Sequence, residues 1–188
     1  YPMMSRQSMD WLKNKVRDLK NPPAMSRLIT KEKQRYVRTN EFRKFLIGGL
    51  YFFAYNPKTR TDLPYYDIFP LVIPLSRYSD CFMGLNMHYL PPRYRAAFMD
   101  KLMNFAMTND QDEPKRLRVT YDILAASSRY REFKPCIKRY LYSHIQSKIL
   151  SVQPEEWDVA LYLPVHQFKK ETAQKVWQES VQQIKKDK

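Results

Sequence analysis

Three aromatic and apolar stretches in the centre of the chain indicate its fold class. They read LYFFAY at residues 50–55, LPYYDIFPLVIPL at residues 63–75 and CFMGLNMHYL at residues 81–90. Aromatic and β-branched residues favour strands, and the segment NPKTR at 56–60 is typical of a turn. The three prolines of the second stretch exclude a helix and also a regular strand in the middle of a sheet. We therefore expect a small, strongly bent antiparallel sheet or an SH3-like barrel.

Helical patterns lie before and after this central block. The expected helices span residues 5–20, which Ser5 would cap, 92–107, 117–126, 135–150 and about 171 onwards. The 135–150 helix is inferred from Ile137, Leu141, Ile145 and Ile149, which recur at spacing four. The run WDVALYLP at 157–164 instead favours a returning strand. The sequence thus predicts an α+β fold, with residues 1–46 as a basic helix and arm and residues 47–188 as a single domain.

The positive charge is unevenly distributed along the 188 residues. The chain has 33 Lys and Arg against 19 Asp and Glu, a net charge of +14. Residues 1–46 have a net charge of +8, residues 47–113 of −1, residues 114–150 of +7, and residues 151–188 of zero. A uniformly solvated surface would not divide in this way, so the two basic blocks indicate a surface that contacts a polyanion.

The sequence contains no recognisable catalytic or metal-binding pattern. Three glycines, two of them adjacent, exclude the glycine-rich phosphate loops, and neither HExxH nor GxSxG occurs. Cys81 and Cys136 are far apart and outside any CxxC pair, so we expect both to be reduced and buried. His88 lies in an apolar run, which favours a buried, hydrogen-bonded histidine. We predict no enzyme activity, no metal site and no cofactor, and no apolar run approaches the roughly 20 residues of a membrane helix.

Basic and aromatic residues alternate in several places, which suits nucleic acid. Examples are Arg35-Tyr36, Arg129-Tyr130-Arg131 and Lys138-Arg139-Tyr140. Basic side chains neutralise phosphates, and exposed tyrosines stack on the bases of a frayed or single-stranded end. The alternative is that the tyrosines pack in the core, and for Tyr140 we favour that alternative. No signature of a sequence-specific reader is present, so we expect contacts to the DNA backbone.

The candidate DNA-binding residues come from both basic blocks. They are Arg35, Arg38, Arg43, Lys44, Lys115, Arg116, Arg118, Arg129, Arg131, Lys134, Lys138 and Arg139.

Four stretches of the chain resemble a known family. LYFFAYNPK at 50–58, LPYYDIFPLVIP at 63–74, GLNMHYLP at 84–91 and EWDVALYLP at 156–164 are similar to a small virion protein of T-even-type contractile-tailed phages, the DNA end protector family. The resemblance spans roughly residues 47–165. It implies a non-catalytic virion protein, present in the host cytoplasm during assembly, that binds the ends of packaged double-stranded DNA and shields them from host exonuclease.

Three functions of different classes remain open from the sequence. The first is DNA-end protection by charge neutralisation. The second is a structural role in the phage neck, tail or baseplate, in which the basic faces contact acidic subunits and other virion proteins, with an oligomer in the particle. A nuclease or packaging enzyme is the third, and it would need clustered carboxylates for metal ions.

Overall fold

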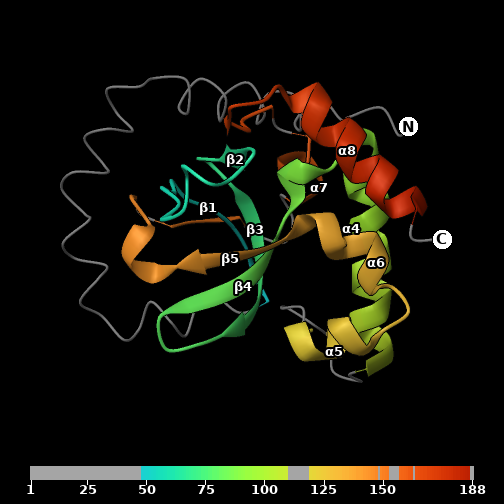
Figure 1. Ribbon diagram of the computed structural model, residues 1–188. Coiled ribbons are helices and arrows are strands. Elements are labelled where there is room, and N and C mark those ends of the chain that lie inside the picture. Colours follow the sequence, from blue (N-terminus) through green and yellow to red (C-terminus); the bar gives the residue numbers. More distant parts are fainter. Residues whose placement is uncertain (1–47, 110–118, 148, 153–156, 163, 187–188) are drawn as a thin grey trace.

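The computed structural model describes residues 48–109, 119–147, 149–152, 157–162 and 164–186 (Figure 1). Its central feature is an antiparallel sheet of five strands in the order β5-β4-β3-β1-β6. The bounds of these strands are Leu50–Phe52 for β1, Leu71–Arg77 for β3, Cys81–Asn86 for β4, Ile137–Leu141 for β5 and Leu150–Val152 for β6. The α+β prediction is confirmed. Because β5 and β6 are free edges among the described residues, the sheet is open, and the expected barrel is not formed.

The prolines of the 63–75 stretch have a different effect from the one expected. The strand β3 lies in the middle of the sheet although it contains Pro74. Its register against β4 shifts between Pro74 and Ser76, so the strand is central but irregular, as a proline in a ladder requires. Opposite Pro74 lies Gly84, where an added Cβ would collide with the Val72 side chain. Gly84 is therefore needed for the close approach of the two strands.

The sheet is buried on both faces, which explains its high aromatic content. Alternate residues of β1 point to opposite sides, so Leu50 and Phe52 join the larger core cluster while Tyr51 joins a smaller one. The smaller cluster is aromatic: the Phe53 and Tyr140 ring centroids are 5.3 Å apart and edge-on, and Phe82 stacks on Tyr140 at 5.4 Å. Tyr140 is only 4% exposed, which confirms its prediction as a core residue.

Helices gather on one side of the strands (Figure 1). They are α4 at Pro92–Asn109, α5 at Tyr121–Ala126, α6 at Tyr130–Phe133, α7 at Trp157–Ala160 and α8 at Ala173–Lys186. Short 3-10 turns, η1 at Met87–Tyr89, η2 at Lys134–Cys136 and η3 at Tyr142–His144, join neighbouring elements. A second, two-stranded sheet pairs β2, Tyr66–Asp67, with β7, Phe168–Lys169. The helices expected at 92–107 and from about 171 are confirmed.

The helix expected at 135–150 is wrong. The segment forms η2, the strand β5 and η3, and β5 pairs with β4 from Cys81↔Leu141 to Leu85↔Ile137. The strand β5 lies at the edge of the sheet, and its residues are mostly half-buried, with Arg139 exposed and Tyr140 buried. It therefore lacks a simple polar–apolar alternation, and the spacing of its apolar residues imitates a helix. Pairing along β4, a tertiary contact, overrides that local pattern.

The strand expected at 157–164 is also wrong. Residues 157–160 form α7, and the buried Trp157, Ala160 and Leu161 follow the helical spacing of three and four. The helix expected at 117–126 is confirmed from Tyr121 to Ala126. Thr120 is its N-cap rather than part of it, and residues 117 and 118 lie outside the described part. The helix at 5–20, the arm at 24–46 and the domain boundary after residue 46 also lie outside it and stay predictions.

Candidate nucleic-acid interface

Two adjoining hollows on one face of the molecule form a continuous groove. The larger, of about 490 Å³, and the smaller, of about 310 Å³, share Tyr65, Tyr89 and Lys138 as lining residues. The larger hollow lies beside the loop 57–66 and β5, and the smaller lies between α6, η2 and α8. We call this feature the tyrosine–lysine groove. Its principal aromatic and basic residues are Lys58, Tyr65, Tyr89, Tyr130, Lys134, Lys138 and Arg139.

The floor of the groove is formed by a lysine on an aromatic ring. The Lys138 ammonium lies 4.0 Å from the centroid of the Tyr89 ring, a short cation–π contact. Burial lowers the pKa of Lys138 because the charged form loses solvation. No ion pair to Lys138 is present within the described residues. Its positive charge is thus held in the groove by an aromatic face, with no carboxylate neutralising it there.

Two half-buried tyrosines stand at the sides of the groove, each held through its hydroxyl. Tyr65 is hydrogen-bonded to Glu179 of α8; burial is the main cause that raises the pKa of this phenol, to about 12, followed by the Glu179 bond. Tyr130 is hydrogen-bonded to Tyr121, with ring centroids 6.4 Å apart. These bonds limit rotation of the two phenol rings that line the groove.

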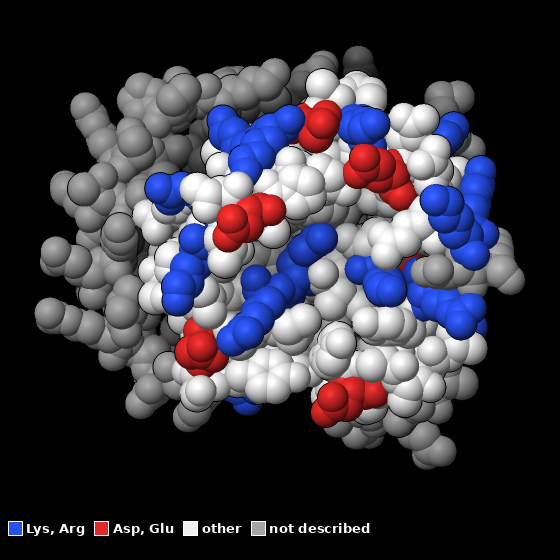
Figure 2. Space-filling view, in the orientation of Figure 1, with Lys and Arg blue, Asp and Glu red and all other residues white. Residues whose placement is uncertain are grey.

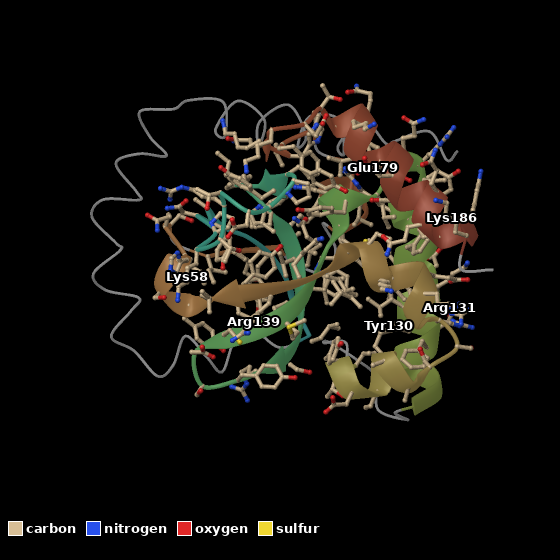
Figure 3. All side chains as sticks on the ribbon, viewed as in Figure 1. Lys58, Tyr130, Arg131, Arg139, Glu179 and Lys186 are labelled. Atoms are coloured by element: carbon tan, nitrogen blue, oxygen red, sulfur yellow. The ribbon has the colours of Figure 1, made fainter. Side chains whose placement is uncertain are left out.

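Basic side chains follow the groove from one end to the other. Lys58 and Arg139 lie toward the C-terminal end of β5, and Tyr130 lies toward the other end (Figure 3). Figure 2 shows Lys and Arg side chains across the middle of this face, with separate acidic side chains among them and around them. Arg139 Nη2 is 3.5 Å from Asp80 Oδ2, and both side chains are more than half exposed. Such an exposed pair contributes little and is easily exchanged for a phosphate.

The wall at residues 58–63 is tied to β7 by one lysine. Lys170 Nζ donates to the carbonyls of Arg60, Thr61 and Leu63, at 2.6, 3.2 and 2.7 Å. Lys170 adopts φ 73°, in the left-handed region that a side chain normally avoids. The strained backbone places the ammonium over three carbonyl oxygens, and this contact fixes the loop that bears Lys58.

A buried polar cluster lies directly behind the groove. Asp67 follows the groove residue Tyr66 in β2, is 4% exposed, and its Oδ2 is 2.7 Å from Nδ1 of the fully buried His88. The same carboxylate accepts from Asn86 Nδ2 and from the backbone N–H groups of Phe69 and Gln167. These donors lower the pKa of Asp67 although burial opposes the shift, whereas burial lowers the pKa of His88. Asp67 is therefore ionised and His88 neutral, donating from Nδ1.

Arg95 and His166 complete this cluster. The buried Arg95 donates to the carbonyls of Leu90 and Leu161 at 2.8 and 2.9 Å, and burial lowers its pKa to about 10. The His166 ring packs on His88 and Trp177, at 5.9 and 5.2 Å, and burial lowers its pKa to about 4. The predicted buried, hydrogen-bonded state of His88 is confirmed. These groups hold β2, β4, α4 and α8 together and are shielded from any large substrate.

The predicted DNA-binding residues divide into two groups. Seven lie outside the described residues: Arg35, Arg38, Arg43, Lys44, Lys115, Arg116 and Arg118. Of the other five, Lys134, Lys138 and Arg139 meet in the groove. Arg129 Nη1 donates to the Lys101 carbonyl at 2.9 Å, so its guanidinium partly serves to fix α6 on α4. Arg131 lies on the outer surface of α6, on the face shown in Figure 3.

Several groove residues were missed by sequence reasoning. Lys58, Tyr65 and Tyr89 come from the neutral central block, where the net charge gave no reason to look for a polyanion site. Pro64, beside Tyr65, was the only local signal, because a proline disfavours a regular strand and so favours a loop wall before β2. The role of Asp67 was also missed, because nothing in the sequence shows that His88 and Gln167 approach its carboxylate.

Comparison with protein families gives one match, which covers most of the chain. The family model described as Phage T4 terminal DNA protecting protein matches residues 6–180. The chain belongs to this family. Comparisons with curated proteins and with solved structures give no match.

Membership of the terminal DNA protecting protein family confirms the resemblance seen in the four sequence stretches. The family description names a bacteriophage protein that protects DNA termini, and it is not that of an enzyme. The match includes all seven principal residues of the tyrosine–lysine groove. Within the described residues, no group of three or more His, Cys, Asp or Glu side chains could hold a metal ion. In the same part of the chain, no helix has the length and apolar character needed to span a membrane.

Proposed function

We propose that this protein is a virion component that binds the ends of packaged double-stranded DNA through backbone contacts and blocks exonuclease access. The observation that carries the proposal is the tyrosine–lysine groove, in which Lys58, Lys134, Lys138 and Arg139 line one continuous depression. Phosphate contacts from such side chains are independent of base sequence. Membership of the terminal DNA protecting protein family supports the same function.

The acidic residues near the groove do not cancel its positive charge. Asp67 is enclosed by its four hydrogen-bond donors, and Glu179 accepts from Tyr65 and lies 3.9 Å from Lys175. Asp80 shares only the long, exposed contact with Arg139. Asp67 and Asp80 also line the larger hollow, but among the ion pairs of the described residues no carboxylate is paired with Lys58, Lys134 or Lys138. These three cations are therefore available to a phosphate that enters the groove.

A salt titration of binding to blunt linear duplex DNA tests the proposal. Each phosphate contact contributes about −0.9 to the slope of log affinity against log salt, so the four groove cations predict a slope of about −3 to −4 or steeper. The triple change Lys58→Gln, Lys134→Gln and Lys138→Gln should reduce that slope by about 3. The matched control is Lys185→Gln, near the C-terminal end of α8, because Lys185 lines neither hollow. This control should change the slope by about 1 at most.

Two results would contradict the proposal. Absence of binding to linear duplex DNA at low salt would favour the structural alternative, in which the basic faces contact acidic virion subunits. Failure of the bound protein to slow digestion of linear DNA by an added exonuclease would exclude end protection. Cutting of the same DNA by the protein with Mg²⁺ present would instead show that it is a nuclease.

A further inference from the structure

We propose that the tyrosine–lysine groove accommodates unpaired nucleotides at the DNA terminus, so that the protein grips a strand separated from its partner at the end of the duplex. The inference deepens the proposed function and rests on it. It names the chemical form of the ligand: a single-stranded terminal segment, with its bases on tyrosine rings and its phosphates on lysine and arginine side chains.

The size of the groove fits separate nucleotides rather than an intact double helix. Its two hollows, of about 490 and 310 Å³, are in the range of sites for small molecules. In a duplex the base faces are stacked on one another and only the outermost pair is free. Tyrosine faces inside a groove can therefore be used by bases only when the terminal nucleotides have left the stack.

Tyr65 and Tyr130 are the rings prepared for such stacking. They line the smaller hollow from different elements, and both are half-buried, with their hydroxyls held by Glu179 and Tyr121. A ring that is already oriented loses little conformational entropy when a base stacks on it. The Tyr89 ring has another role, since its face is occupied by the Lys138 ammonium at 4.0 Å.

The cations are placed along the path that the strand would follow. Lys134 and Lys138 line the smaller hollow beside the two tyrosines, and Lys58 and Arg139 line the larger one with Lys138. Alternation of aromatic faces and positive charges along a groove is the arrangement by which proteins bind single strands without sequence preference. Lys138, shared by the two hollows, would contact the phosphate between two adjacent nucleotides.

Equilibrium binding to four DNAs with the same duplex part tests the inference. They are a duplex closed by hairpin loops at both ends, a blunt duplex, and duplexes with a short 3′ or 5′ overhang. The overhang duplexes should bind about tenfold more tightly than the blunt duplex, since a stacked base contributes roughly 1–3 kcal/mol, and 1.4 kcal/mol is tenfold. A blunt duplex should in turn bind more tightly than the closed one.

Substitution of the tyrosines separates stacking from charge. Tyr65→Ala and Tyr130→Ala should remove most of the preference for an overhang, so that the affinities of each variant for the overhang and blunt duplexes differ by no more than about twofold. Tyr65→Phe, which keeps the ring, should retain the preference. The control Tyr78→Ala removes a tyrosine that is 46% exposed and lines neither hollow, and it should have no effect.

A fluorescent terminal base gives a second measurement with the unmodified protein. 2-Aminopurine at the unpaired terminal position should be quenched on binding, because stacking on a tyrosine ring changes its environment. Equal affinity for blunt and overhang duplexes, with no quenching, would overturn the inference while leaving end protection intact. Equal affinity for the hairpin-closed duplex and for the duplexes with free ends would overturn the proposed function as well.

Discussion

The tyrosine–lysine groove and the buried cluster behind it use charge in opposite ways. They are adjacent in the chain, since Tyr65 lines the groove and Asp67, two residues later, is the centre of the cluster. In the cluster, Asp67 is surrounded by hydrogen-bond donors and His88 is fully buried. In the groove, the Lys138 ammonium lies over the Tyr89 ring, and Arg139 makes a long, exposed contact with Asp80.

The difference shows how a structural charge can be told from a binding charge. A buried ion is retained when several hydrogen bonds replace its solvation, and it then serves the fold. A cation without a carboxylate partner, in an open groove, keeps its capacity for an incoming anion. Both kinds of residue occur within the family-matched part of the chain, so membership of the family alone does not distinguish them.

The largest expected effect comes from breaking the buried cluster. Asp67→Ala leaves the N–H groups of Phe69 and Gln167, the Asn86 amide and His88 without their acceptor. We expect the free energy of unfolding to fall by about 3–5 kcal/mol, the cost of removing one partner of a buried polar pair. Urea denaturation followed by circular dichroism measures this.

The matched control is Asp100→Ala on the exposed face of α4, which should change the free energy of unfolding by no more than about 0.5 kcal/mol. If Asp67→Ala were equally mild, the cluster would not be the structural centre that its geometry indicates.

Acid should weaken the cluster before it affects the groove cations. Burial lowers the pKa of His166 to about 4 from 6.5, with His88 and Arg95 acting in the same direction and Asp67 opposing. Between pH 4 and pH 6.5 the unfolded chain binds more protons than the native protein. The contribution of His166 to the free energy of unfolding is therefore fully present above pH 6.5 and is lost as the pH falls toward 4. His88, whose pKa burial also lowers, contributes with the same sign.

The decrease in the free energy of unfolding that His166 causes should remain below about 1.4 kcal/mol per pH unit, which is the limit for one proton, because its ring is partly exposed to solvent. Chemical denaturation at a series of pH values measures the slope, and His166→Gln should make it shallower. A variant with the same slope as the original protein would show that the pKa of His166 does not differ between the native and the unfolded state.

The smallest effect concerns the link between the two regions. Lys170→Ala removes three hydrogen bonds from Lys170 Nζ to the loop that bears Lys58, and we expect a loss of about 1 kcal/mol, since the contact is exposed. Lys170→Gly should cost less than Lys170→Ala, because glycine relieves the strain at φ 73°. Differential scanning calorimetry compares the two variants.

Both Lys170 variants should weaken DNA binding by a few-fold through the position of Lys58, whereas the groove cations themselves are unchanged. DNA affinity equal to that of the original protein would mean that the loop keeps its position without the lysine.

Local patterns predicted correctly those elements whose aromatic or amphipathic pattern is unambiguous. The aromatic stretch at 50–55 contained β1, the pattern at 92–107 formed α4, and the amphipathic pattern after residue 171 formed α8. The pattern failed at β5, because its partner strand β4 is distant in the sequence and the burial of the β5 residues does not alternate between its two faces. It failed at α7 because three buried residues fit a short helix as well as a strand.

By itself, the sequence determined the fold class, the basic character and the family of the protein, since these depend on composition and on local motifs. Only the tertiary structure decided which charges are available. Lys58, Lys134 and Arg139 meet because the 57–66 loop, η2 and β5 border the same groove. Asp67 is withdrawn from solvent because His88, Asn86 and Gln167 approach it from distant positions. The availability of a charge depends on burial and hydrogen-bond partners, and both are properties of the folded chain.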